Sequence, residues 1–459
     1  MAGITTSDAI ASLLKVYYKD GVENLFFRDS PVLKMIEKER VEGKQTNFAA
    51  LYGRGGAVSG DYTKAKAAAA STARNVEYQV LPGQIFSVYT LNSKEVQASL
   101  TSKGAYMKVG GNKMFAASEA FRKTMDVALY GSGYGEICTY PDTVALTQNV
   151  AADITLSDSA LQGIDIGSVL DVKTSVTAGS VAVKLTVNAI NGNVVNVTPD
   201  TSYTPNATDV ICLAGSMDTS GNPLLPFGFT AWLPVVAKRT GSAWKNYIET
   251  KAFCVDRSIA ADRLAGQFVD GTGDTKKVDT VQKLLKKVRR AGSKADMIVM
   301  NDADWLEVSK EIESTNTYFT QTSSKGKKSA TVGFDSLAAS FSTNFIDNII
   351  DDPACPQGMF FILDKDSISL ATYTNVDKLD NKVAGNEPGK QEVEAMANEG
   401  TETDRNGLII DDYLNVQPGV GDINGPSVEV ALQMFGSLLV KNPSVNGVGL
   451  FAGATVMNY

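Results

Sequence analysis

The stretch ASEAFRKTMDVALYGSGYGEI, residues 117–137, joins an apolar helical stripe to three alternate glycines. Apolar side chains recur here at steps of three and four residues, which places them on one face of a helix of about five turns. The stripe consists of Met114, Ala117, Phe121, Met125, and Ala128 with Leu129. The segment therefore predicts a long helix that packs by one face and ends at the glycines.

The glycines Gly131, Gly133 and Gly135 follow this helix rather than precede one. A dinucleotide-binding loop has to follow a strand and open a helix, so that the helix N-terminus faces the pyrophosphate. At a helix C-terminus, glycine instead adopts the left-handed conformation that satisfies the last carbonyls. We therefore predict a helix cap that turns the chain away and has no need to bind anything.

The sequence contains no histidine among its 459 residues. Histidine is the side chain whose ordinary pKa lies nearest neutral pH, and it is the commonest metal ligand. Its absence excludes Ser–His–Asp and Cys–His catalytic arrangements and the H-E-x-x-H zinc site. An enzyme built from this chain would depend on carboxylates, lysine or tyrosine alone. We therefore predict a protein that is not an enzyme and that has no metal and no cofactor.

The length and the net charge of the chain narrow the possible classes of protein further. A single hydrophobic core stops growing near roughly 250–300 residues, so this chain is expected to form two or three packed units. The formal net charge is −8, whereas proteins that read nucleic-acid sequence are usually basic on at least one face. The first residues form no secretory signal, and no apolar run approaches the roughly 20 residues that span a bilayer. We expect a soluble, non-exported chain that touches DNA at most non-specifically.

The remaining candidate sites are interpreted as structural. The cysteines are far apart and form no C-x-x-C, which indicates separate thiols in a reducing compartment; they are Cys138, Cys212, Cys254 and Cys355. GTGDTKK (271–277) and SKGKKS (324–329) lack the full phosphate-loop pattern and are interpreted as exposed turns. The basic residues of KLLKKVRR (283–290) fall on the solvated side of a predicted helix.

Two pairs of adjacent carboxylates are candidate catalytic acids. They are Asp351–Asp352 and Asp411–Asp412. A glycosidase needs two carboxylates that converge across a cleft, and adjacency in sequence does not provide this. We interpret both pairs as acids that cap loops.

The pattern along the chain divides it into segments. QTNFAALYG and VEYQVLPGQIFSVYTLN read as two strands of a long β-hairpin around a Gly- and Ala-rich excursion, with Pro82-Gly83 as a turn or kink. Residues 140–215 contain short Val-rich strands separated by Gly, Asn and Ser, which is typical of a small antiparallel barrel or sandwich. From residue 216 the pattern is mixed α/β, with an amphipathic helix in DTVQKLLKKVRRAG.

Four motifs, in this order, resemble those of the major capsid proteins of tailed bacteriophages, which have the Hong-Kong-97-like fold. The first, D-x-A-L-x-G-x-G at the end of the predicted helix, is matched by Asp126, Ala128, Leu129, Gly131 and Gly133. The second, V-x-R-S…R-L-A-G, is matched by Val255, Arg257, Ser258 and Arg263 to Gly266. The third motif is carried by Met300, Asn301 and Trp305, and the fourth by Cys355, Pro356, Gly358, Leu363 and Asp364. The resemblance covers residues 45–135 and 225–459.

The resemblance implies an α+β Hong-Kong-97-like capsid fold with an inserted small β-barrel domain. The implied parts are an N-terminal arm (1–45), an E-loop hairpin (46–91), a peripheral domain with the spine helix (92–137), the inserted domain (138–216), an axial domain (217–350), and a return through the axial and peripheral domains to C-terminal strands (351–459). The inserted domain is a departure from the minimal fold. The arm that begins near Met1 leaves no room for a cleaved scaffolding segment, so a separate scaffolding protein, or none, is expected.

The resemblance also implies a structural function. The chain would assemble with itself through pentamers and hexamers into an icosahedral head around double-stranded DNA, in the virion and, during assembly, in the host cytoplasm. Scaffolding, portal and decoration proteins are further partners on this interpretation. Lys64, Lys66 and Arg74 near the E-loop tip are predicted to pair with acids of a neighbouring subunit. The alternatives are an encapsulin-like nanocompartment shell and a carboxylate-dependent hydrolase.

Overall fold

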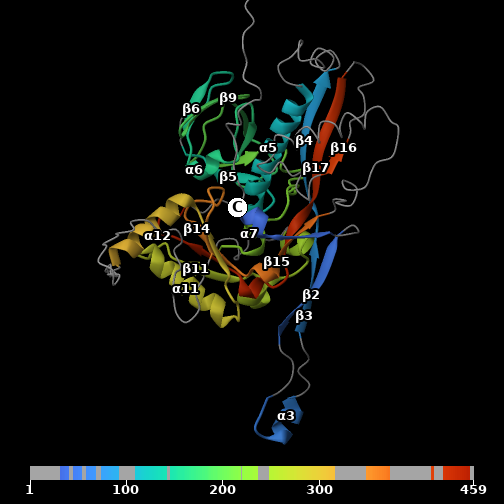
Figure 1. Ribbon diagram of the computed structural model, residues 1–459, viewed down its shortest axis with the longest axis vertical. Helices are drawn as coiled ribbons and strands as arrows, with labels where there is room; N and C mark the ends of the chain where they lie inside the picture. Colours follow the sequence, from blue (N-terminus) through green and yellow to red (C-terminus); the bar gives the residue numbers. More distant parts are fainter. Residues whose placement is uncertain are drawn as a thin grey trace, which may run out of the picture.

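The computed structural model describes residues 31–40, 45–53, 58–68, 74–92, 109–141, 145–218, 220–235, 248–315, 348–372, 415–417 and 427–454. Most of the predicted arm (1–45), the SKGKKS segment (324–329) and the pair Asp411–Asp412 lie outside these residues. Within them the chain forms a mixed α+β fold with three sheets and a separate two-stranded hairpin (Figure 1).

The helix predicted from the apolar stripe is α5 (Val109–Tyr130). Phe121, Met125 and Leu129 are each at most 2% exposed, so the predicted buried face is confirmed. The helix lies along strand β4 (Gly83–Asn92), as Figure 1 shows. The hydroxyl of Ser87 on β4 donates to the carbonyl of Ala117 at 3.1 Å.

The sheet under α5 is organised by β17 (Ser427–Val440). This strand pairs antiparallel with β4 over ten residues, from Ser427 opposite Asn92 to Gly436 opposite Gly83. On the opposite edge of β17 lie β15 (Ile368–Thr372) and β16 (Asn415–Gln417). A short helix, α2 (Pro31–Met35), leads into β1 (Glu37–Arg40), which pairs in parallel with β15.

A hairpin projects from this body, as predicted. It consists of β2 (Thr46–Gly53) and β3 (Arg74–Val80), paired from Thr46 opposite Val80 outward. A short helix that the sequence analysis did not predict, α3 (Tyr62–Ala68), lies at its far end (Figure 1).

The predicted return strand is two strands that belong to different sheets, with the break at Leu81-Pro82. Proline has no N–H to donate to a ladder, and the Ser437 hydroxyl holds the bend by accepting from Gly83 N at 3.1 Å and donating to Leu81 O at 3.0 Å. The kink expected at Pro82-Gly83 thus separates β3 in the hairpin from β4 in the large sheet.

The Val-rich block forms an antiparallel six-stranded sheet with a core of its own. In sheet order its strands are β5 (Glu136–Thr139), β10 (Val210–Leu213), β7 (Val169–Lys173), β8 (Val183–Asn191), β9 (Val194–Pro199) and β6 (Ala152–Thr155), with α6 (Asp158–Leu161) beside them. The sheet is curved in Figure 1, but within the described residues its end strands β5 and β6 are not paired with each other. The small antiparallel fold is confirmed, and a closed barrel stays a prediction.

The third sheet mixes parallel and antiparallel pairs and is flanked by two helices. Its order is β11 (Gln267–Asp270), β18 (Gly447–Leu450), β14 (Met359–Leu363), β12 (Met297–Met300) and β13 (Asn348–Asp351). The helices are α11 (Lys277–Arg290) and α12 (Asp302–Thr315). On α11, Val281, Leu284 and Val288 are buried, as its periodicity predicts. The turns η3 (Lys365–Ser367) and η4 (Pro443–Val445) connect β14 to β15 and β17 to β18, so the chain links the two large sheets twice.

The glycine-rich end of α5 turns the chain into β5. Gly133 and Gly135 have φ angles of +95° and +70°, in the left-handed region, and a Cβ on Gly135 would lie 2.5 Å from the Cβ of Ser216. The cavity beside the turn has a volume of about 20 Å³, enough for about one water molecule. The predicted helix-ending turn is confirmed, and this cavity is far too small for a nucleotide.

Replacing Gly135 by alanine should destabilise the chain by about 2–4 kcal/mol, because the new side chain meets both a left-handed φ and the Ser216 contact. Gly131→Ala is the matched control, since a Cβ there would lie 3.5 Å from the nearest atom, the Ala128 oxygen. We expect it to change the free energy of unfolding by less than about 1 kcal/mol. Urea midpoints compare the two, and equal midpoints would contradict this explanation.

Candidate functional site

The three predicted contact residues lie on the projecting hairpin. Lys64 and Lys66 are on α3 at its far end, and Arg74 begins β3; all three are exposed. Within the described residues none of them has an ion-pair or side-chain hydrogen-bond partner. The structure therefore gathers them on one element but does not test their predicted pairing with a neighbouring subunit.

Large apolar side chains are exposed on the same hairpin. Leu51, Val58 and Tyr62 are 63%, 103% and 80% exposed, respectively. Scattered single apolar residues are ordinary on a protein surface, but these three lie along one projection with little core of its own. The outer part of the hairpin thus combines apolar surface with unpaired cations, which together suit a protein surface with apolar and acidic groups.

The base of the hairpin, in contrast, is packed into the body by aromatic rings. Phe48 of β2 stacks on Tyr78 of β3 with ring centroids 5.1 Å apart. Tyr78 in turn lies 5.4 Å from the ring of Trp232, which stacks on Phe253 at 4.2 Å. Tyr78, Trp232 and Phe253 are fully buried. Trp232 belongs to the short helix α7 (Phe229–Trp232), and its indole N–H donates to Leu438 O on β17 at 2.7 Å.

Residues 253–264 bind both strands of the hairpin. This segment includes the turn η2 (Arg257–Ala260) and the helix α10 (Ala261–Leu264). On β3, the Tyr78 hydroxyl donates to Leu264 O at 2.8 Å and Gln79 N donates to Phe253 O at 3.1 Å. On β2, the guanidinium of Arg263 donates to Tyr52 O. The V-x-R-S…R-L-A-G motif thus holds the hairpin along its length, a role that its sequence alone does not indicate.

Arg257 of this motif is a buried cation, 1% exposed. One guanidinium nitrogen donates to the carbonyls of Ala231 and Trp232 at 2.9 and 3.1 Å, and Nε lies 3.5 Å from Glu249. The guanidinium also lies over the Phe253 ring at 5.4 Å. Burial lowers the pKa of Arg257, and Tyr78 and Glu249 partly oppose this. Burial raises the pKa of Tyr78, so its hydroxyl stays protonated and donates to Leu264 O.

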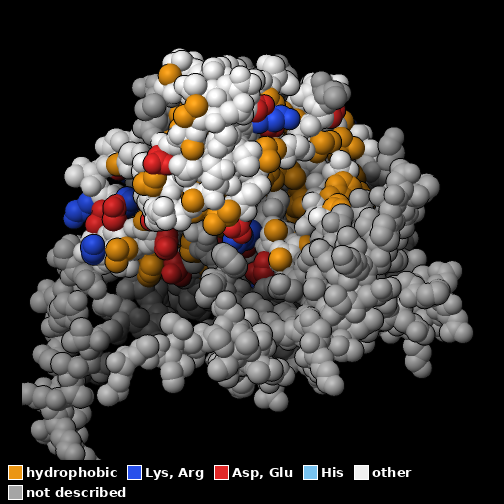
Figure 2. All heavy atoms as spheres, turned by 90° about the horizontal axis from the view of Figure 1, so that it is seen from above, with side chains coloured by type: hydrophobic (Ala, Val, Ile, Leu, Met, Phe, Trp, Pro, Cys, Tyr) orange, Lys and Arg blue, Asp and Glu red, His pale blue; other side chains and the backbone are white. Residues whose placement is uncertain are grey.

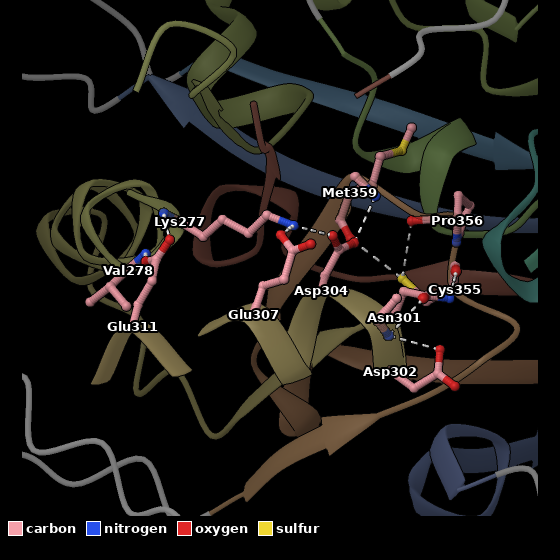
Figure 3. A network of polar contacts seen from close by, with 12 residues as sticks. Lys277, Val278, Asn301, Asp302, Asp304, Glu307, Glu311, Cys355, Pro356 and Met359 are labelled. Carbon is pink, nitrogen blue, oxygen red and sulfur yellow. Dashed lines mark hydrogen bonds and ion pairs between the residues drawn. The ribbon is translucent and has the colours of Figure 1, made fainter. Parts of the chain in front are cut away.

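A second polar network joins α11, α12 and the loop before β14 (Figure 3). Lys277 contacts two carboxylates, Asp304 at 2.6 Å and Glu307 at 2.6 Å. The other oxygen of Asp304 accepts from Gly358 N at 2.7 Å, and Glu311 accepts from the first N–H groups of α11. Burial by itself lowers the pKa of Lys277, but the two carboxylates outweigh it and the pKa is raised.

Asn301 of the third motif and Cys355 of the fourth meet beside this network.

 Asn301 donates to Cys355 O at 2.9 Å, and Asp352 accepts from the Tyr130 hydroxyl at 2.7 Å and from Ala354 N at 2.9 Å. Burial raises the pKa values of Tyr130 and Cys355 well above their ordinary range, and Asp352 adds to this. Asp352 therefore caps a loop, as predicted, while Asp351 is exposed.

A cleft of about 410 Å³ separates this network from the six-stranded sheet. Its walls include Lys277, Asp304 and Glu307 on one side and Cys138 on the other. Both carboxylates bind Lys277, and burial raises the pKa of Cys138 to about 12. These groups provide neither the free carboxylate pair of a glycosidase nor a thiolate at neutral pH.

The described residues contain no group of three or more Cys, Asp or Glu side chains that could hold a metal ion. On the face seen in Figure 2, the described Lys and Arg side chains are scattered among uncharged and acidic ones and form no continuous basic patch. No described helix is long and apolar enough to cross a membrane.

The two carboxylates that contact Lys277 should differ greatly in their effect on stability. Asp304 is 2% exposed and Glu307 is 62% exposed, although both lie 2.6 Å from the same ammonium. Asp304→Asn should cost about 3–5 kcal/mol, because it leaves a largely buried cation with one exposed partner. Glu307→Gln should cost less than about 1 kcal/mol, since solvent screens an exposed charge. Urea unfolding of both variants tests this, and similar losses would refute it.

Comparison with known proteins identifies the fold. No protein-family model and no curated protein sequence matches the chain. A chain of the capsid asymmetric unit of cyanophage A-1(L) matches 98% of this chain and 100% of its own length, with a TM-score of 0.56 and 12% identity.

Two further solved structures align over almost the full length at lower similarity. The capsid of the native GTA particle aligns with a TM-score of 0.46 and 10% identity, over 98% of this chain and 100% of its own. The encapsulin of Synechococcus elongatus aligns with a TM-score of 0.45 and 8% identity, over 99% of both chains. These two matches do not choose between a phage head and a nanocompartment. The cyanophage match shows that this chain has the fold of a phage capsid protein.

Proposed function

We propose that this chain is the major capsid protein of a tailed phage and assembles with itself into an icosahedral head around double-stranded DNA. The observation that carries the proposal is the full-length match to the cyanophage capsid chain. The order of the sequence motifs supports it independently. The described Asp351–Asp352 pair and the cleft groups give no support to a hydrolase.

On this proposal, each structural unit has a place in the subunit. The hairpin β2–β3 is the E-loop, α5 is the spine helix, the sheet around β17 forms the peripheral domain, and the sheet around β14 forms the axial domain. The six-stranded sheet is the inserted domain. Scaffolding, portal and decoration proteins are proposed as further partners.

The hairpin supplies the assembly energy in this scheme. Burying the exposed surface of Leu51, Val58 and Tyr62 on a second copy releases about 25 cal/mol for each Å² of apolar surface. Each contact of this size is weak, but a closed shell repeats it in every subunit, and the sum is large. Ring closure into pentamers and hexamers follows when such contacts are heterologous. The net charge of −8 allows packaged DNA to be held without strong adhesion.

Negative-stain electron microscopy of the purified chain, alone and co-expressed with its neighbouring genes, tests the proposal. We expect closed shells, or rings of five and six subunits, in at least one preparation. Shell diameter separates a genome container from a small compartment, which would favour the encapsulin-like alternative. Stable monomers in both preparations would refute a shell-forming function.

Charge reversal at the hairpin tip tests the predicted contact residues. The variant Lys64→Glu, Lys66→Glu, Arg74→Glu should remain folded and lose most of its shells, because three cations that face a neighbour become acids. Lys276→Glu, Lys286→Glu, Arg290→Glu is the matched control, with the same change in charge at exposed positions on and beside α11. Sedimentation of assembled material compares them. If the two variants assemble equally well, the prediction that the tip residues contact a neighbouring subunit is wrong.

A further inference from the structure

The hairpin is held to the body through a small set of residues, which we call the clamp. The clamp consists of Trp232, Phe253, Arg257, Arg263 and Leu264. Tyr78 of β3 contacts three of them: it lies 5.4 Å from Trp232 and 6.3 Å from Phe253, between ring centroids, and its hydroxyl donates to Leu264 O. The Tyr78 contacts lie toward the inner end of the hairpin, and the bond from Arg263 to Tyr52 O lies near the outer end of β2.

Toward its outer end the hairpin is largely exposed. The burial of β3 falls from Tyr78 and Val80, which are buried, to Arg74 and Asn75, which are exposed. In Figure 1 the hairpin extends from the body to α3 as a long projection. The direction of the projection therefore depends on its base.

Simple geometry shows how sensitive the tip is to the base. The helix α3 lies beyond the outer ends of β2 and β3 (Figure 1), so a rotation of the hairpin at the clamp moves α3 farther than it moves the strands. A displacement of about 3 Å, the length of a hydrogen bond, is enough to separate a tip side chain from a fixed partner. Tip side chains can meet fixed partners only if the clamp is rigid.

Arg257 gives the clamp its rigidity. It is the central member, because it bonds the carbonyls of Ala231 and Trp232, approaches Glu249, and lies over Phe253. A guanidinium is planar and presents its donors in fixed directions, whereas a lysine ammonium on a flexible stem does not. Its position thus fixes Trp232 and Phe253, the two rings against which Tyr78 packs.

We propose that Arg257 is a positioning residue that fixes the direction in which the hairpin leaves the body, and so presents the hairpin tip to a second copy of this chain. The second half rests on the proposed function. The first half does not, because it concerns the single subunit.

The direction of the hairpin can be measured in unassembled subunits by the distance between two nitroxide labels. One label is attached at Lys64→Cys on α3 and the other at Lys286→Cys on α11, in a Cys254→Ser background because Cys254 is exposed. Arg257→Lys keeps the charge but loses the fork, and Tyr78→Phe removes only the hydroxyl that reaches Leu264. Both variants should remain folded and broaden the distance distribution about twofold.

Tyr130→Phe is the matched control. Tyr130 is also buried, and its hydroxyl donates at 2.7 Å to Asp352, which is not a clamp residue. A merely destabilising change would act equally at both tyrosines, so the control should lose stability without broadening the distribution. Unchanged widths in folded Arg257→Lys and Tyr78→Phe, or equal broadening in Tyr130→Phe, would overturn the proposal.

Shell formation by the same variants tests the second half. Where the unmodified chain forms shells, Arg257→Lys should form fewer shells or shells of mixed size, and Tyr130→Phe should match the unmodified chain. If Arg257→Lys broadens the distribution of label distances but still forms normal shells, the link between hairpin direction and assembly is overturned. If the unmodified chain forms no shells at all, the proposed function fails, while the label distances still decide the role of Arg257.

Discussion

The pairing of β4 with β17 is the interaction on which the rest of the structure depends. It joins two segments separated by more than three hundred residues, and such long-range pairing is costly until other contacts reinforce it. Here α5 packs across β4, and Ser437 of β17 holds the bend that directs the chain into the hairpin. Trp232 is fixed to the same strand through Leu438, so the hairpin base, the long helix and the sheet share one support.

Buried polar groups complete this arrangement. Arg257 joins the carbonyls of α7 to the Phe253 ring, while Asp304 and Asp352 tie α12 and the loop before β14 to α11 and α5. Charges buried in this way contribute little net stability compared with apolar residues of the same volume. They do fix geometry, because each accepts only a few arrangements of its neighbours. For the proposed assembly with identical copies, such fixed geometry matters more than extra stability.

Local pattern was enough to predict the long helices α5 and α11 and the overall order of parts, but not the short helix α3. The stripes of α5 and α11 follow from the helical period, the turn at Gly133 and Gly135 follows from the need for left-handed φ, and Val-rich alternation identified the six-stranded sheet. The clamp could not be predicted in this way, because Tyr78, Trp232 and Arg257 are brought together only by the tertiary fold. The same holds for Lys277 and Asp304. For Lys64, Lys66 and Arg74 the sequence predicted exposed positions on a projection, but their partners would belong to another molecule.

The chain enters and leaves the six-stranded sheet at neighbouring positions. Its first strand in sequence, β5, pairs with its last, β10, so Glu136 lies opposite Cys212, about 5 Å away between antiparallel neighbours. A segment whose two ends are adjacent can be replaced without changing the spacing or the direction of the elements that flank it. The module is thus exchangeable in principle: a different domain, or a short turn, can occupy the same junction while α5 and the two large sheets keep their places.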